Sequence, residues 1–197
     1  MTGETPASVK FEEMARGQAE ILVPMIAAVM AEARLDFEDL DAIATTVGPG
    51  SFTGLRIGLA TARGFALASG KPIIAVTSFE AFLAGTDPAS RQGRRVAVLI
   101  DSRRGPVFGQ IFDADGRAEG DACSIEVEAV AAWLSDPETL LTGDGVALLP
   151  GAHDSKVARI RPEAVALAAA RLPVAEAVRR PALPLYLRAP DVTLPRR

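Results

Sequence analysis

The feature that most constrains the fold of this chain is a short glycine loop, Gly48-Pro49-Gly50-Ser51-Phe52-Thr53-Gly54. The apolar residues 42–47 before it predict a buried strand, and the apolar spacing over 53–68 predicts a helix that ends at Ser69-Gly70. A buried strand that turns tightly into a helix is typical of α/β proteins. Because the first N–H groups of such a helix are free and its dipole is positive there, the loop is also a place where an anion can bind.

Two phosphate-binding fingerprints can be tested against this loop by counting. The Walker pattern needs a glycine and a lysine five and six residues after its first glycine, and the fifth residue after Gly48 is Thr53, with no lysine following. The dinucleotide pattern Gly-x-Gly-x-x-Gly fits at Gly48 and Gly50, but Thr53 occupies its third glycine position, one residue before Gly54. The loop therefore matches neither fingerprint.

Two interpretations of the loop remain open. The first is a tight turn that lets the strand and the helix pack closely. The second is a weak binding site for ATP or ADP with Mg²⁺. This site would also include the carboxylate that follows a later apolar strand, 96–100. That carboxylate, in the sequence Asp101-Ser102-Arg103, is also suited to cap a turn. The residues of the nucleotide interpretation are Gly48, Gly50, Ser51, Thr53 and Asp101.

The helices on either side of the first strand carry more apolar surface than one buried stripe requires. Residues 15–33 have apolar residues at spacings of three and four, with Pro24 inside, and predict a kinked helix. The second helix has small residues every fourth position, which lie on one face and allow a close approach by the chain's own sheet or by another helix. The residues predicted to bind a partner are Leu22, Met25, Ile26, Val29, Gly54, Gly58 and Ala62.

The remaining sequence predicts two lobes. Strand 72–76 leads into a short helix capped by Thr77 or Ser78, and the arginine-rich loop 85–95 marks a boundary. Strands 96–100 and 107–112, the hairpin turn 113–116, a short strand at 140–142 and a helix at 162–172 follow. The predicted lobes are residues 1–86 and 94–197. Val9, Phe11 and Met14 are interpreted as the tail of an earlier strand.

Composition excludes several classes of protein. With 49% hydrophobic and 23% charged residues, the 197-residue chain is globular, and its net charge of −4 argues against a stand-alone nucleic-acid binder. The longest apolar run, Ile21–Ala31, is shorter than the roughly 20 residues of a membrane span, and the first residues do not form a secretory signal. One cysteine, Cys123, and one histidine, His153, provide neither a disulfide nor a zinc site. These features predict a soluble cytoplasmic protein.

The string Gly48-Pro49-Gly50-Ser51-Phe52-Thr53-Gly54-Leu55-Arg56-Ile57-Gly58 resembles the signature of the bacterial TsaB (YeaZ) family. The segments 16–25, 101–108 and 185–188 resemble that family as well, so that the likeness covers most of the chain. The resemblance implies an α/β protein with an actin/Hsp70-like, ribonuclease-H-like fold of two lobes. It also implies a role in forming N6-threonylcarbamoyladenosine on tRNA.

The resemblance further implies a non-catalytic scaffold. Family members pair with the catalytic paralogue TsaD through a bundle of the corresponding helices, and the ATPase TsaE joins the pair. In the paralogue two metal-binding histidines lie one helical turn apart, and Ser78 and Phe82 occupy those positions here. No metal site is therefore expected. A homodimer through the same helices is expected when the partner is absent, and tRNA contact is expected through the complex.

The amino terminus departs from the family pattern. Family members begin with a strand similar to Leu-Ala-Leu-Asp-Thr-Ser and a second strand after it, and nothing in this sequence matches them. The expectation from the sequence is that this N-terminal hairpin is truncated, which would expose an edge of the sheet and weaken the nucleotide interpretation.

Overall fold

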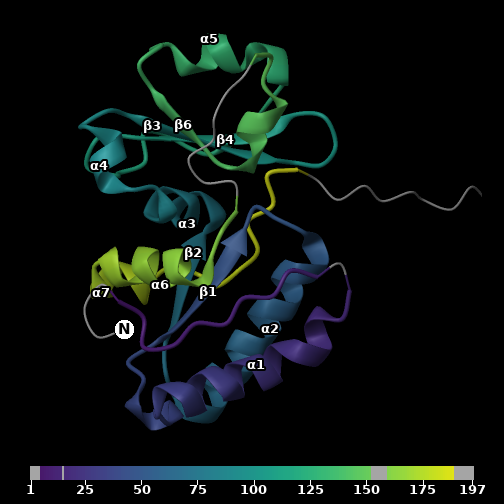
Figure 1. Ribbon diagram of the computed structural model, residues 1–197, viewed down its shortest axis with the longest axis vertical. Helices are drawn as coiled ribbons and strands as arrows, with labels where there is room; N and C mark the ends of the chain where they lie inside the picture. Colours follow the sequence, from purple (N-terminus) through teal and green to yellow (C-terminus); the bar gives the residue numbers. More distant parts are fainter. Residues whose placement is uncertain (1–4, 15, 152–158, 189–197) are drawn as a thin grey trace, which may run out of the picture.

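The structure, a computed structural model, describes residues 5–14, 16–151 and 159–188. It has two lobes, each built on its own sheet (Figure 1). The first sheet pairs β1 (Ile43–Gly48) with β2 (Ile73–Thr77) in parallel, with Thr45 opposite Ala75. The second sheet has the order β5-β4-β3-β6, with the strands Val96–Asp101 (β3), Val107–Phe112 (β4), Cys123–Ile125 (β5) and Leu140–Thr142 (β6).

The first lobe is layered outward from its sheet. Helix α2 (Phe52–Ser69) packs on β1 and β2 through the buried side chains of Leu55, Leu59 and Ala62. Helix α1 (Gln18–Ala33) lies against α2, on the outside of the lobe (Figure 1). The 3₁₀ turn Phe37–Asp39 connects α1 to β1, and the ring of Phe37 stacks on that of Phe65 of α2.

In the second lobe, β3 is the central strand, and its residues from Val96 to Ile100 are all buried, as expected of a near-continuous apolar run between two neighbouring strands. β4 runs antiparallel to β3 and β6 parallel to it. The predicted turn after β4 forms, since the N–H of Gly116 donates to the carbonyl of Asp113. The short helices of this lobe are α4 (Pro88–Arg91), α5 (Val130–Leu134) and the 3₁₀ turns Val127–Ala129 and Asp144–Leu148.

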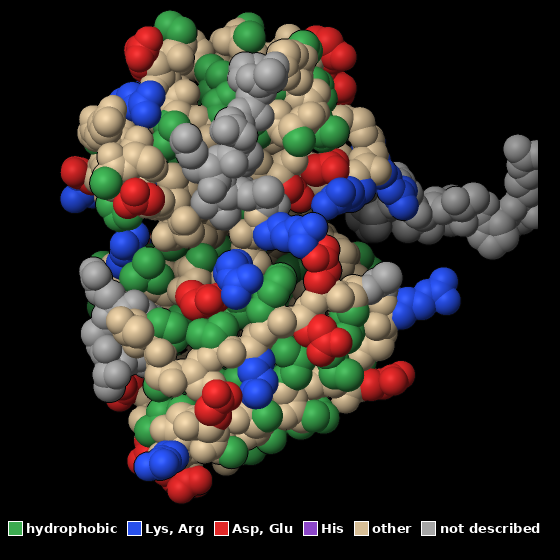
Figure 2. Space-filling model, viewed as in Figure 1, with side chains coloured by type: hydrophobic (Ala, Val, Ile, Leu, Met, Phe, Trp, Pro, Cys, Tyr) green, Lys and Arg blue, Asp and Glu red, His purple; other side chains and the backbone are tan. Residues whose placement is uncertain are grey.

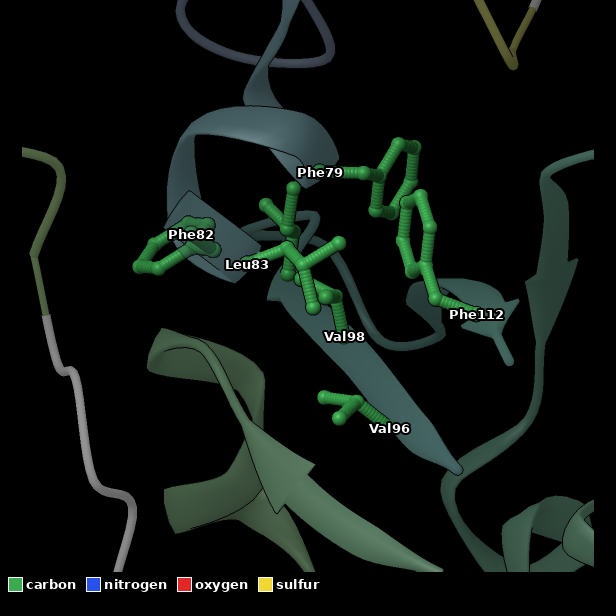
Figure 3. Close-up of a cluster of buried hydrophobic side chains, with 7 residues drawn as sticks. Phe79, Phe82, Leu83, Val96, Val98 and Phe112 are labelled. Atoms are coloured by element: carbon green, nitrogen blue, oxygen red, sulfur yellow. The ribbon is translucent and has the colours of Figure 1, made fainter. Parts of the chain in front are cut away.

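Helix α3 (Ser78–Gly85) joins the two lobes. Of the two predicted caps, Thr77 and Ser78, the structure has Thr77. Its side chain accepts from the N–H of Glu80, while the Glu80 carboxylate accepts from the N–H of Thr77. Six of its eight residues are buried. Figure 3 shows side chains of this helix against side chains of the second sheet, in a core cluster of Phe79, Phe82, Leu83, Val96, Val98, Ile100 and Phe112.

The carboxyl-terminal part of the described chain returns to the first lobe. Helix α6 (Pro162–Arg171) packs on α3, β1 and β2, and its Ala168 and Ala169 share a core cluster with Val76, Ala81 and Ala84. Helix α7 (Val174–Ala177) lies beside β2. The predicted boundary within 85–95 separates the two sheets, but the lobes are not contiguous in sequence, because α6 comes from the segment 94–197.

Two local predictions are wrong. Residues 6–14 form no strand, and Phe11 is exposed with the guanidinium of Arg161 above its ring, so no strand neighbour covers it. Helix α1 begins at Gln18 rather than at 15, after Gly17 with a φ of 86°. His153 lies outside the described residues. Among the residues described, no helix is long and apolar enough to cross a membrane.

Candidate functional site

The first residue of the glycine loop has a backbone conformation that favours glycine. Gly48 has a φ of 107°, which a side chain strongly disfavours, and the Gly48–Pro49 peptide is cis. A Cβ at Gly48 would lie 2.9 Å from Cδ1 of Leu55 and 3.1 Å from the carbonyl oxygen of Leu185. The loop is therefore packed on both sides, by α2 and by the carboxyl-terminal segment, which agrees with the tight-turn interpretation.

The polar groups of the loop have structural partners. The hydroxyl of Ser51 accepts from the N–H of Gly54 at 3.0 Å and caps α2. The N–H of Leu185 donates to the carbonyl of Val47 at 2.7 Å, so that the carboxyl-terminal segment passes directly beside the loop. Gly50 and Thr53 are exposed. Four of the five residues of the nucleotide interpretation thus lie together, with Ser51 already engaged.

The fifth residue, Asp101, lies in the other lobe, at the end of β3. Its Oδ1 accepts from the N–H of Arg103 at 2.6 Å, and its Oδ2 is 3.1 Å from Nη1 of the same arginine. Asp144 completes the group, because its Oδ1 accepts from the N–H of Asp101 at 3.0 Å and its Oδ2 is 3.2 Å from Nη2 of Arg103. Asp101 therefore caps its own turn and pairs with Arg103.

Burial raises the pKa of the Asp144 carboxyl above its ordinary value, although the Asp101 N–H and Arg103 act in the opposite direction. A carboxyl whose pKa is higher in the folded than in the unfolded state binds its proton more tightly when folded. The quantity to compare is the free energy of unfolding of the wild type minus that of Asp144→Asn. We expect this difference to increase as the pH falls from neutrality through the folded pKa of Asp144. The difference should level off once the pH lies below the ordinary pKa of an aspartate side chain, 3.8.

Urea unfolding of the two proteins at a series of pH values measures this difference. The asparagine variant keeps an acceptor for the Asp101 N–H, so it serves as the reference without the titrating group. A difference that stayed constant, or that shrank as the pH fell, would contradict the assigned effect of burial.

A groove of about 470 Å³ lies between the lobes beside the glycine loop. Its charged groups are the carboxylate of Glu80 and the guanidinium of Arg180, which form an ion pair, and Arg180 also pairs with Glu176 at 2.6 Å. Burial opposes the charge of Arg180, but the hydrogen bonds to Glu80 and Glu176 outweigh it and raise the pKa of the guanidinium. The other lining residues are Val47, Ala75, Thr77, Gln110, Phe112, Ala118, Pro181, Leu183, Pro184 and Leu185.

Sequence reasoning did not find this groove. Glu80 and Arg180 are 100 residues apart, and neither belongs to a motif with a recognisable spacing. The groove depends on how the carboxyl-terminal segment returns between the lobes, and no local pattern indicates that path. Figure 2 shows Lys and Arg side chains along the junction of the two lobes.

The residues predicted to bind a partner separate into two groups. None of the 16 residues of α1 is buried, and Leu22, Met25, Ile26 and Val29 are only half-buried. Figure 2 shows hydrophobic side chains exposed over the lower lobe, where α1 lies. The small-residue stripe of α2, which is Gly54, Gly58 and Ala62, differs from α1. Ala62 is buried, and a Cβ at Gly58 would lie 3.7 Å from the hydroxyl of Thr45 in β1. Gly54 lies against Ser51, the residue that caps α2.

The stripe therefore packs, at Gly58 and Ala62, against the chain's own sheet. The available surface of the first lobe is the outer face of α1, where Val23 has 48% of its area exposed. The exposed end of α2 adds Leu67. An interaction surface on this lobe is accordingly expected on α1 rather than on the glycine stripe.

Ser78 and Phe82, which stand where the catalytic paralogue is expected to have histidines, are both buried in α3. Phe82 belongs to the core cluster between the lobes. Among the described residues, no three His, Cys, Asp or Glu side chains lie close enough together to hold a metal ion. Both positions thus serve the packing of the chain's own core.

Comparison with known proteins gives the family. Residues 9–157 match the family model of TsaD, tRNA N6-adenosine threonylcarbamoyltransferase. The chain is 54% identical to the tRNA N6-adenosine threonylcarbamoyltransferase of Erythrobacter litoralis over 69 residues, which is 35% of this chain and 20% of that protein. It thus spans about a fifth of the length of that transferase.

Two longer matches are to smaller proteins. The tRNA threonylcarbamoyladenosine biosynthesis protein TsaB of Escherichia coli K12 is 29% identical over 172 residues, 73% of this chain and 72% of that protein. The structure of YeaZ from Pseudomonas aeruginosa superimposes with a TM-score of 0.72 at 27% identity, covering 90% of this chain and 88% of the other. The predicted actin-like fold and the family resemblance are confirmed. The chain belongs to the TsaD family of proteins and, within it, resembles the TsaB (YeaZ) members over most of its length.

Proposed function

We propose that this chain is a non-catalytic subunit that pairs with a TsaD-type transferase in the formation of N6-threonylcarbamoyladenosine on tRNA. The names of its relatives supply the pathway. The observation that supports the scaffold role is the exposure of α1, an apolar helix of 16 residues of which none is buried. A TsaE-type ATPase joins the pair, and a second copy of the chain covers α1 when the transferase is absent.

The exposure of α1 is unusual for its composition. Its sequence from Ile21 to Ala31 has no charged residue, yet α2 covers only one side of it. Apolar surface left in water costs about 25 cal/mol per Å² relative to its burial, and monomeric proteins rarely expose large contiguous apolar patches. An apolar outer helix of this kind is what a partner protein covers.

The non-catalytic assignment rests on positions in α3. The metal-binding histidines expected of the catalytic paralogue are replaced by Ser78 and Phe82, whose side chains are buried. A phenylalanine cannot ligate a metal, and the serine hydroxyl is a poor substitute for imidazole. The partner therefore supplies the chemistry, and this chain supplies the surface that holds it.

Val23→Asp tests the proposal. A carboxylate at the centre of an apolar interface loses its hydration and gains no partner. The binding free energy should weaken by about 2 kcal/mol or more, which is at least about thirtyfold in affinity. We expect the variant to fold but to lose co-purification with the TsaD-type protein of the same organism. Isothermal titration of the purified pair measures the affinity, and light scattering of the chain alone measures self-association.

Val178→Asp is the matched control, because the exposed areas of the two valines are nearly equal, 48% for Val23 and 51% for Val178. Val178 follows α7, away from α1 in sequence. Pairing should survive this substitution. If Val23→Asp paired with the transferase as tightly as the wild type, α1 would not be the interface and the proposal would fail.

A further inference from the structure

We propose that this chain, although its net charge of −4 is not that of a typical nucleic-acid binder, has a local RNA-binding surface in which the exposed rings of Phe52 and Tyr186, close to arginines, stack on unpaired bases of single-stranded RNA. The surface lies where α2 begins, next to the carboxyl-terminal segment. The inference deepens the proposed function, since tRNA would be the substrate of the complex, but it concerns a surface separate from the outer face of α1.

Three π-systems lie next to one another at this place, with a guanidinium over one ring and a second ring tilted against the first. The guanidinium carbon of Arg56 lies 3.7 Å from the centroid of the Phe52 ring. The centroids of Phe52 and Tyr186 are 5.8 Å apart, and their rings are tilted by 30°. Phe52 has 46% and Tyr186 47% of its area exposed, so both aromatic side chains are partly open to solvent. A base has a flat π-face that can extend such a stack, whichever base it is.

The chain holds Tyr186 in this outward position. The hydrogen bond from Leu185 N–H to Val47 fixes the segment against β1. Leu185 and Leu187 pack against the core cluster between the lobes, and in an extended segment alternate residues point to opposite sides. Tyr186 therefore faces outward as a consequence of the packing of its two neighbours.

Two arginines are close to this place: Arg56 lies over the Phe52 ring, and Arg188 follows Tyr186 by two residues in the sequence. Arg56 and Arg188 form no ion pair within the described part of the chain, and Nη1 of Arg188 is 3.4 Å from the carbonyl oxygen of Arg104. Arg103, by contrast, is neutralised by Asp101 and Asp144. Arginines without an ion-pair partner among the described residues, together with exposed rings, suit a ligand that carries an anionic group next to each flat base, as RNA does.

A second aromatic–arginine pair in the chain lacks these features. Arg161 lies over the ring of Phe11 with its guanidinium carbon 4.8 Å from the centroid, but no second ring is stacked there. Arg161 is also paired with Glu163 at 3.4 Å. Phe11 therefore provides a matched comparison for the stack at Phe52.

Fluorescence anisotropy with the full chain tests the proposal. The probe is a labelled twelve-nucleotide oligoadenylate, compared with a duplex RNA of the same length. We expect tighter binding of the single strand, because a duplex keeps its bases stacked on one another. Tyr186→Leu keeps an apolar side chain but removes the ring, and should weaken binding of the single strand by about tenfold, within the range known for base stacking.

Further variants separate stacking from charge. Arg188→Gln should reduce the slope of log affinity against log salt concentration by about 0.7, the value for one phosphate contact on a single strand. Phe11→Leu and Arg179→Gln are the controls, an exposed aromatic residue and an exposed arginine that take no part in the contacts of Phe52, Arg56 and Tyr186, and should bind as the wild type does. Circular dichroism should show the same melting for all variants.

Equal or tighter binding of the duplex, or unchanged binding by Tyr186→Leu, would overturn the proposal. So would a Tyr186→Leu variant that lost its TsaD-type partner while its RNA affinity stayed the same, because the stack would then be a protein contact. The measurement uses the chain alone, so a negative result leaves the pairing through Val23 standing, and failure of that pairing leaves the RNA measurement interpretable.

Discussion

Gly143→Ala should lower the free energy of unfolding by at least about 3 kcal/mol, a large part of the 5–15 kcal/mol that stabilises a typical domain. Gly143 follows β6 and has a φ of 104° and a ψ of 164°, a conformation found essentially in glycine alone and costing about 1–3 kcal/mol for other residues. The alanine methyl group would also overlap the carbonyl oxygen of Leu99 in the central strand and lie 3.2 Å from its nitrogen.

This collision involves backbone, which cannot move aside as the end of a side chain can. Relieving it requires β6 and β3 to separate next to the pair of Val98 and Thr142, where the two strands are joined in parallel. The second sheet would lose an outer strand there. Urea unfolding followed by circular dichroism measures the change.

Gly64→Ala is the matched control, with an effect of opposite sign. Gly64 lies on the exposed face of α2, and a Cβ there meets no atom within 4 Å. Alanine in place of glycine inside a helix stabilises it by about 0.5–1 kcal/mol. A Gly143→Ala variant that unfolded at the wild-type urea concentration would show that the backbone contact with Leu99 is not as the structure has it.

Phe79→Ala should destabilise the chain by about 3–5 kcal/mol, the usual loss for a buried phenylalanine replaced by alanine. Phe79 is fully buried, and Figure 3 shows its ring, from α3, beside that of Phe112, from β4. Phe79 thus belongs to the helix that joins the lobes, and Phe112 to the sheet of the second lobe. The cavity would therefore open between the lobes, and we expect faster hydrogen exchange along both β4 and α3, together with a lower melting temperature.

Phe11→Ala gives the comparison, since Phe11 is exposed and contacts the guanidinium of Arg161. The Phe11→Ala variant should lose about 1 kcal/mol or less of its free energy of unfolding. If the two variants were equally stable, or if exchange increased in one lobe only, the cluster around Phe79 would not couple the lobes.

Much of the fold could be predicted from local sequence. The strand, glycine loop and helix around Gly48, the helix capped by Thr77 or Ser78, and the apolar strand Val96–Asp101 were predicted within about two residues of where the structure has them. Each depends on interactions between residues close in sequence, so that composition and spacing are sufficient. The three-residue strand Cys123–Ile125 was missed, because it pairs only with β4 and many of the residues around it are polar, unlike the apolar Leu140-Leu141 of the equally short β6.

The candidate site could be predicted only in part. Periodicity shows that a helix has an apolar face but not what covers it. The small residues Gly58 and Ala62 look as suitable for a partner helix as for a sheet, and the structure turns them toward β1, while the equally apolar α1 remains outside. Which of the two helices is covered depends on the order in which sheet, α2 and α1 are layered, and this order is a property of the whole lobe.

The sequence by itself determined the local units, the two-lobed family resemblance and the replacement of two expected metal ligands by Ser78 and Phe82. Only the tertiary structure decided which apolar helix stays uncovered, that Glu80 pairs with Arg180, and that the ring of Tyr186 lies beside that of Phe52. The physical reason is range. Local conformation follows from neighbours within a few residues, whereas contacts between residues a hundred or more apart depend on the path of the entire chain.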